Sequence, residues 1–452
     1  MPTENETAKR RGLSVIHAAP LLVAFLLALR ASELIRDNSF LWHIRAGSVQ
    51  VASGKVLTTD PFSYTANGEG WRTQSWLVDL MYARLESVTG SLTWANWFVF
   101  VVGAGVLVLM GIAIYDRTRS PVVLTGSLIV AMWLFAPFAQ ARPVIVSYVL
   151  MASLVLILRW KSELLWLLVP LFWIWAGVHG SWVLGGGLVI LELLRTRDTR
   201  LVRVGAVSLF ATLATAHGIG TWTVLYEFSQ AREALGLIEE WLPPDFGDIA
   251  QAPYLIVLIG LFFGFARGKL EARDLIVILP FLIFGMTSRR AVFPATIVLL
   301  PYAVSAVPVP KLHARATSGL APVIAMVLLA GVALSPMVFR PLGLLDAERF
   351  PRASIVDSVE GRTPFHDSAV GGYLIYDSWP TNLVYIDDRA ELYGFERFQD
   401  LRKALSGDYE DVFERNGIEV AIVKPDSPLH RRLVKDGWSA IAVTDEFISM
   451  EP

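Results

Sequence analysis

Apolar residues dominate the first three quarters of the chain, where they form long runs that polar segments separate. A helix that crosses a bilayer needs about 20 apolar residues, so runs of this kind are typical of membrane proteins. The runs at 181–194 and 253–266 are short for a span, and we expect some runs to merge, tilt or re-enter. The pattern predicts about eleven transmembrane helices, near residues 13–35, 92–115, 120–137, 143–159, 163–178, 181–194, 201–217, 253–266, 273–288, 290–307 and 317–338.

Composition supports a polytopic membrane protein and excludes several other classes. Of the 452 residues, 54% are hydrophobic and 18% are charged, whereas soluble domains carry about 25% charged residues. A formal net charge of -2 does not favour binding of a polyanion, so we predict no nucleic-acid partner. The chain has no cysteine, which excludes disulfides, thiolate metal sites and a cysteine nucleophile.

Arginine and lysine residues gather in every second connection between the apolar runs. Positively charged connections stay on the cytoplasmic side of a membrane. We therefore predict a multi-pass protein of the cell membrane, with a cytoplasmic tail at 1–12, a membrane domain at 13–338, and outer loops at 36–91 and 218–252. Lys9, Arg10 and Arg11 precede the first run without a small-residue cleavage site, which indicates a retained signal anchor.

Beyond residue 338 the composition becomes that of a soluble domain. Segments 372–377, 383–387, 418–423 and 438–443 have the pattern of strands, and they alternate with helical stretches near 395–416 and 427–436. This alternation predicts a small extracytoplasmic α/β domain with partly parallel pairing over 339–452.

The stretch from 37 to 76 is the first long polar interruption, and it is much longer than a connector requires. Asp37 follows Arg30 and Glu33 on one helix face. Arg30 and Glu33 fit a pair that neutralises itself, with Glu33 as a secondary site candidate. Asp37 lies at the membrane boundary, where a carboxylate can stay ionised beside a dry cavity, and has the stronger claim to function.

Other residues of this stretch have structural interpretations beside their possible roles in a site. Trp42 and His43 fit an interfacial aromatic beside a hydrogen-bonded imidazole. Alternatively, His43 orients a sugar hydroxyl or a phosphate, or moves a proton. Asp60, before Pro61, first indicates a turn. Trp71 belongs either to an aromatic belt or to a platform on which a sugar stacks.

Further ionisable residues fall on the predicted outer side. They could form a shared site, or they could anchor the protein to lipid headgroups or belong to a solvated loop surface. Two His-Gly pairs at helix ends favour a common polar cavity, and paired arginines in a tight turn favour an anionic partner such as a phosphate. The candidates are Arg142, His179, His217, Glu240, Arg289 and Arg290.

Several motifs together resemble a family of bacterial GT-C-like multi-pass membrane proteins, over nearly the whole chain. They are D-x-x-x-x-W-H-I-x-x-G at 37–47, TDPFSYT-x-x-G-x-x-W at 59–71, SWL at 75–77, ARP at 141–143, W-A-x-x-H-G at 175–180, HG-x-x-x-W at 217–222, E-W-x-P at 240–243, SRR at 288–290, D-S-A-V-G-G-Y-L-I at 367–375 and I-D-D-R-A-E-L-Y-G at 386–394.

The resemblance implies a GT-C glycosyltransferase that moves a sugar from a polyprenyl-phosphate-linked donor to a glycan, lipid or protein acceptor on the outer face. It makes Asp37 the general base, with inversion at the anomeric carbon, and it assigns Arg142, Arg289 and Arg290 to the leaving phosphate. The family pattern is D-x-D before W-H, but residue 39 is Ser39 here. We therefore expect no required cofactor, and a divalent metal is disfavoured.

The missing second acid leaves a non-catalytic alternative open. In it the chain is a GT-C-derived scaffold, a lipid-binding subunit or a transporter in the assembly of envelope glycans. No inverted repeat of the kind found in transporters is visible in the sequence.

Overall fold

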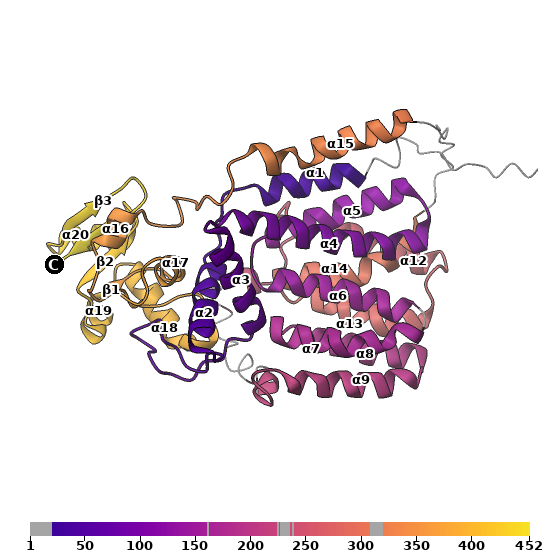
Figure 1. Cartoon of the computed structure of the whole chain (residues 1–452), viewed down its shortest axis with the longest axis horizontal. Coiled ribbons are helices and arrows are strands. Elements are labelled where there is room, and N and C mark those ends of the chain that lie inside the picture. Colours follow the sequence, from indigo (N-terminus) through magenta and orange to yellow (C-terminus); the bar gives the residue numbers. More distant parts are fainter. Residues whose placement is uncertain (1–19, 161, 224–225, 227–235, 237–238, 308–319) are drawn as a thin grey trace, which may run out of the picture.

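The computed structural model describes residues 20–160, 162–223, 226, 236, 239–307 and 320–452. Helices of the N-terminal part run side by side, and the smaller C-terminal domain lies beyond one end of this bundle (Figure 1). The bundle helices are α1 (Pro20–Ala31), α4 (Thr93–Thr118), α5 (Pro121–Phe135), α6 (Val144–Arg159), α7 (Leu168–Val178), α8 (Trp182–Thr196), α9 (Arg200–Ala211), α12 (Tyr254–Ala266), α13 (Leu275–Gly285), α14 (Arg289–Ala303) and α15 (Leu320–Phe339).

Each of the eleven apolar runs contains one of these helices, but their lengths do not support eleven membrane spans. Among the described residues, two helical segments are long and apolar enough to cross a membrane. They are Thr93–Thr118, of 26 residues and mean hydropathy 2.6, and Pro121–Phe138, of 18 residues and mean hydropathy 1.9. Two such helices are weak evidence, because a buried core helix of a soluble protein has the same length and composition. The chain is mostly helical and has one small sheet among the described residues.

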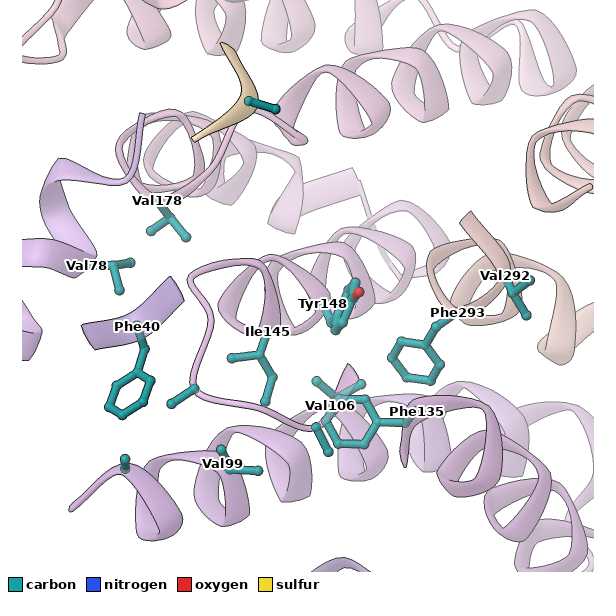
Figure 2. Close-up of a cluster of buried hydrophobic side chains, with 14 of the residues drawn as sticks. Phe40, Val78, Val99, Val106, Phe135, Ile145, Tyr148, Val178, Val292 and Phe293 are labelled. Atoms are coloured by element: carbon teal, nitrogen blue, oxygen red, sulfur yellow. The ribbon is translucent and has the colours of Figure 1, made fainter. Parts of the chain in front are cut away.

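Helix α14 is the centre of the bundle, because every residue from Ala291 to Ala303 is buried. It packs against α5, α6, α12 and α13. Figure 2 shows Phe293 beside Phe135 and Tyr148, and the ring centroid of Phe293 lies 5.0 Å from that of each of them. Aromatic rings at these separations pack favourably. They give the ends of α5, α6 and α14 a fixed arrangement.

The predicted outer loop at 36–91 contains two helices, which its interpretation as a loop did not anticipate. It forms α2 (Ser39–Ser53) and α3 (Trp76–Thr89), which lie across the end of the bundle toward the C-terminal domain (Figure 1). Helix α2 is buried over successive residues such as Phe40, Leu41 and Trp42, because it is covered on both sides. It therefore lacks the one-sided apolar stripe by which a surface helix is recognised.

The C-terminal domain has a four-stranded sheet in the order β1-β2-β4-β3. Its strands are β1 (Pro364–Phe365), β2 (Val420–Val423), β3 (Ser439–Val443) and β4 (Ile448–Glu451). Pro364 pairs with Val420 in the parallel pair β1 and β2, and Ala421 and Ala440 both pair with Met450 of antiparallel β4. The helices are α16 (Ala353–Asp357), α17 (Ser368–Ser378), α18 (Ala390–Leu405), α19 (Glu410–Asn416) and α20 (Pro428–Lys435).

The predicted α/β domain with partly parallel pairing is confirmed, as are the strands within 418–423 and 438–443. The strand predicted at 372–377 is wrong, because those residues belong to α17. The Asp367 side chain caps that helix at the Val370 N–H, and a Cβ at Gly371 would lie 1.9 Å from the Ile386 carbonyl oxygen. Close packing thus overrides the β propensity of the segment. Residues 383–387 hold only one bridge, between Val384 and Ser63.

A buried arginine joins the segment between α2 and α3 to the C-terminal domain. Arg389, 1% exposed, donates from Nη1 to Asp60 Oδ1 at 2.8 Å and from Nε to Asp387 Oδ1 at 2.8 Å. Its guanidinium also lies 4.4 Å from the ring centroid of Trp71. Asp60 accepts the N–H groups of Phe62 and Ser63 as well, so the predicted turn at Asp60 is confirmed.

We expect Arg389→Met to lower the free energy of unfolding by about 3–5 kcal/mol, because it leaves two buried carboxylates without their cation. The matched control is Arg397→Ala, which removes a half-exposed ion pair with Glu69 between the same two segments and is expected to cost about 1 kcal/mol or less. Unfolding followed by tryptophan fluorescence measures both. Equal losses in the two variants would contradict the assigned role of Arg389.

Candidate functional site

Two adjoining cavities lie at the end of the bundle that faces the C-terminal domain. The first, here called the polar cavity, has a volume of about 140 Å³. The second, the apolar cavity, has about 300 Å³ and lies among α6, α7, α8, α13 and α14. Both are lined by Val144, His179, Trp241 and Arg290, so these four residues form their common boundary.

Several separate parts of the chain line the polar cavity, among them α2, the segment before α3, the turn before α6 and the start of α18. Helix α2 contributes Trp42 and His43, and the turn before α6 contributes Arg142. The start of α18 and the residues before it contribute Asp388 and Glu391. The site is therefore complete only when the C-terminal domain is docked on the bundle.

A chain of alternating charges runs beside the polar cavity. Arg142 donates from Nε to Asp37 Oδ2 at 2.5 Å and from Nη1 to both oxygens of Glu240 at 3.1 Å. Arg290 Nε lies 3.5 Å from Glu240 Oε2. The other Asp37 oxygen accepts the backbone N–H groups of Ser39 and, at 3.4 Å, Phe40, so both carboxylate oxygens of Asp37 are engaged.

These contacts shift the titration of the partners. Burial alone would lower the pKa of Arg142, but the facing carboxylates of Asp37 and Glu240 raise it above its ordinary value. Burial alone would raise the pKa of Glu240, but Arg142 and Arg290 hold it below the usual range. Both groups therefore stay charged at neutral pH.

An acid that the sequence interpretation missed holds His43. Asp79 Oδ1, in α3, lies 2.6 Å from His43 Nδ1, and Asp79 Oδ2 accepts from Thr73 Oγ1 at 2.5 Å and from Gln50 Nε2 at 3.2 Å. Because an ionised carboxylate only accepts, His43 Nδ1 carries the proton in this arrangement. The His43 ring is also stacked on Trp42, with 3.5 Å between the ring centroids. Asp79 follows the SWL motif by two residues, and this proximity was the available signal.

Asp388 is the second acid that was not singled out. Its Oδ1 accepts the indole N–H of Trp42 at 2.7 Å, and its side chain lines the polar cavity. Burial and the neighbouring Asp387 raise the pKa of Asp388 to about 6, although Arg142 opposes the shift. The two successive acids after the apolar segment 383–386 were the signal in the sequence.

The structure brings together eight of the twelve predicted site residues. The polar cavity is lined by Trp42, His43, Trp71, Arg142, His179 and Arg290. Asp37 and Glu240 join them through Arg142.

The other candidates lie elsewhere. Glu33 forms an ion pair with Arg30 at 3.1 Å, which is the self-neutralising pair predicted from the sequence. Asp60 is bound to Arg389, and Arg289 is paired with Glu239. His217 Nε2 lies 2.8 Å from the Thr73 carbonyl oxygen, next to the cavity but not among the residues that line it.

Over the described residues, no group of three or more His, Asp or Glu side chains is placed to hold a metal ion. No protein-family model matches the chain, and no curated protein matches it by sequence.

The close approach of α2 and α3 sets the position of Asp79, and it depends on a glycine. A Cβ at Gly47 would lie 1.9 Å from the Asp79 carbonyl oxygen. We expect Gly47→Ala to push the helices apart and lower the free energy of unfolding by about 1–3 kcal/mol. Gly187, in α8, has open space around its Cβ position, so Gly187→Ala is the control and is expected to be neutral or stabilising by up to about 1 kcal/mol. Thermal unfolding of both variants checks this, and equal midpoints would refute it.

Proposed function

We propose that the chain is a membrane glycosyltransferase that takes a sugar from a polyprenyl-phosphate-linked donor. The observation that carries the proposal is the union of an apolar and a polar cavity with a cation, Arg290, at their boundary. The donor is divided in the same way, because its isoprenoid is apolar, its phosphate is anionic and its sugar is polar. Ligand sites combine an apolar lining with a few polar groups that fix orientation.

Each part of the donor meets suitable side chains. Met151, Trp175 and Phe284 line the apolar cavity, where the first isoprene units would lie. Arg290 would bind the phosphate and stabilise the charge that develops on it as the sugar departs. Trp42 and Trp71 would face the sugar in the polar cavity. Asp37 acts in this proposal through Arg142, because both of its oxygens are already engaged.

A membrane position for the bundle is part of the proposal. Large apolar side chains are exposed on several helices, among them Val101, Val108, Phe262, Leu328 and Val332. Exposed apolar surface of this extent is unusual for a soluble monomer. His179 and Arg142 lie at the end with the cavities, so the arginine-rich connections after α4 and α8 lie at the other end (Figure 1).

Single-cysteine labelling tests the topology cleanly, because the chain has no cysteine of its own. We expect Glu360→Cys, in the C-terminal domain, to react with a membrane-impermeant maleimide added outside intact cells. Lys269→Cys, between α12 and α13, should react only after the membrane is opened. Both positions are exposed. Labelling of both from the same side would exclude the proposed topology.

The adjacent arginines at the start of α14 provide a test of donor binding. We expect Arg290→Ala to weaken binding of undecaprenyl phosphate at least about 10-fold, because a charge-assisted contact to phosphate is lost. Arg289→Ala is the control, since Arg289 pairs with Glu239 and lines neither cavity. Native mass spectrometry of the full chain in detergent measures both, with undecaprenol as the lipid without phosphate.

Transfer of sugar is measured on membranes that contain the chain, supplied with radiolabelled hexosyl and pentosyl polyprenyl phosphates. If label enters envelope material only when the wild-type chain is present, the result supports the glycosyltransferase activity. Binding of undecaprenyl phosphate without any transfer would favour the non-catalytic, lipid-binding alternative. Equal binding of undecaprenol and undecaprenyl phosphate would contradict a phosphate site at Arg290.

A further inference from the structure

We propose that Asp388 is the general base of the reaction, an inference that rests on the proposed glycosyl transfer. The acceptor hydroxyl oxygen forms a bond to the anomeric carbon while the bond from that carbon to the phosphate oxygen breaks. The hydroxyl proton passes to the Asp388 carboxylate, and the electron pair of the broken bond leaves with the polyprenyl phosphate. The products are the glycosylated acceptor, the lipid phosphate and a protonated Asp388.

Asp388 is held in place but keeps one oxygen available. Its Oδ1 accepts the Trp42 indole N–H at 2.7 Å, while the described residues place no hydrogen bond on Oδ2. The next residue, Arg389, is locked by Asp60 and Asp387, so the backbone at 388 has little freedom. A base fixed in this way can meet a hydroxyl without a large rearrangement.

The other carboxylates near the polar cavity are already committed to contacts within the protein. Asp37 and Glu240 are bound to Arg142, and Asp79 is bound to His43, Gln50 and Thr73. Asp60 and Asp387 hold Arg389, and Glu391 accepts from Trp71. Asp388 and Glu391 are the carboxylates that line the cavity among the described residues, and both are partly exposed and accept one indole N–H each. Asp388 also interacts with Arg142 at the end of the bundle, where the donor phosphate is proposed to lie.

His43 is the competing base, since it lines the same cavity and is backed by Asp79. Its side chain is 7% exposed and is covered by the stacked ring of Trp42. Asp388 is only half-buried and lies on the indole edge of the same tryptophan. Access therefore favours Asp388 as the group that meets the acceptor.

The electrostatic surroundings suit a base that works near neutral pH. A general base is most effective when its pKa is close to the working pH, and the pKa of Asp388 is raised to about 6 by burial and by Asp387. The charged and titratable groups that face it are Asp37, His43, Arg142, His179, Arg290, Asp387, Arg389 and Glu391.

The test compares Asp388→Asn with wild type and with Glu396→Gln, an exposed acid of α18 that serves as control. Sugar transfer from radiolabelled polyprenyl-phosphate sugars is measured from pH 5 to 8, and binding of undecaprenyl phosphate is measured in parallel. We expect Asp388→Asn to lower transfer about 100-fold or more, as removal of a general base does, with binding unchanged within twofold. Glu396→Gln should transfer like wild type.

The pH profile separates Asp388 from His43. Wild-type transfer should fall as pH drops through about 6, because the Asp388 carboxylate becomes protonated and cannot accept the hydroxyl proton. This fall should disappear in the residual activity of Asp388→Asn. A fall that persists in the variant assigns the base to another group, His43 first, and overturns the proposal.

Three further results are distinguishable. Wild-type transfer together with undiminished transfer by Asp388→Asn overturns the base and leaves the proposed function intact. Loss of transfer together with loss of lipid binding in Asp388→Asn makes Asp388 structural and also overturns the base. Absence of transfer by the wild-type chain overturns the proposed function and the base with it.

Discussion

The arrangement of the whole site depends on one buried cation. Arg389 is bound by Asp60 from the segment between α2 and α3 and by Asp387 from its own domain, with Trp71 against its face. A buried guanidinium is tolerated only where carboxylates neutralise it, so the two parts of the chain must meet in one register. That register places Asp388 over the end of the bundle, next to Trp42.

A second cation, Arg142, links separate segments on the bundle side of the cavity. It binds Asp37 at the start of α2 and Glu240 in the 3-10 turn Glu239–Trp241. The polar cavity thus lies between two arginine clusters whose charges are balanced by fixed carboxylates. Charges that are held in this way need little reorganisation when a reaction moves charge between them.

The periodic features of the structure could be predicted from the sequence, and the contacts between distant segments could not. All eleven apolar runs contain helices, but the lengths of those helices do not support eleven spans. Helix α2 was not predicted, because burial on both sides removes its amphipathic stripe. Segment 372–377 has strand-like composition, yet the close contact at Gly371 makes it helical. Arg142 and His43 were found by residue type, whereas Asp79 and Asp388 become meaningful only through partners 36 and 346 residues away.

The boundary between the two cavities is where the proposed chemistry is most constrained. Arg290 lies in the first turn of α14, whose N-terminal end carries a partial positive charge, and it also lies 5.1 Å from the ring centroid of Trp241. Its carboxylate partner, Glu240, is 3.5 Å away and shared with Arg142. A phosphate that enters from the apolar side would therefore compete with Glu240 for a cation that is only partly neutralised. The sugar would then project toward Trp42 and Asp388, which is the direction that direct transfer to an acceptor requires.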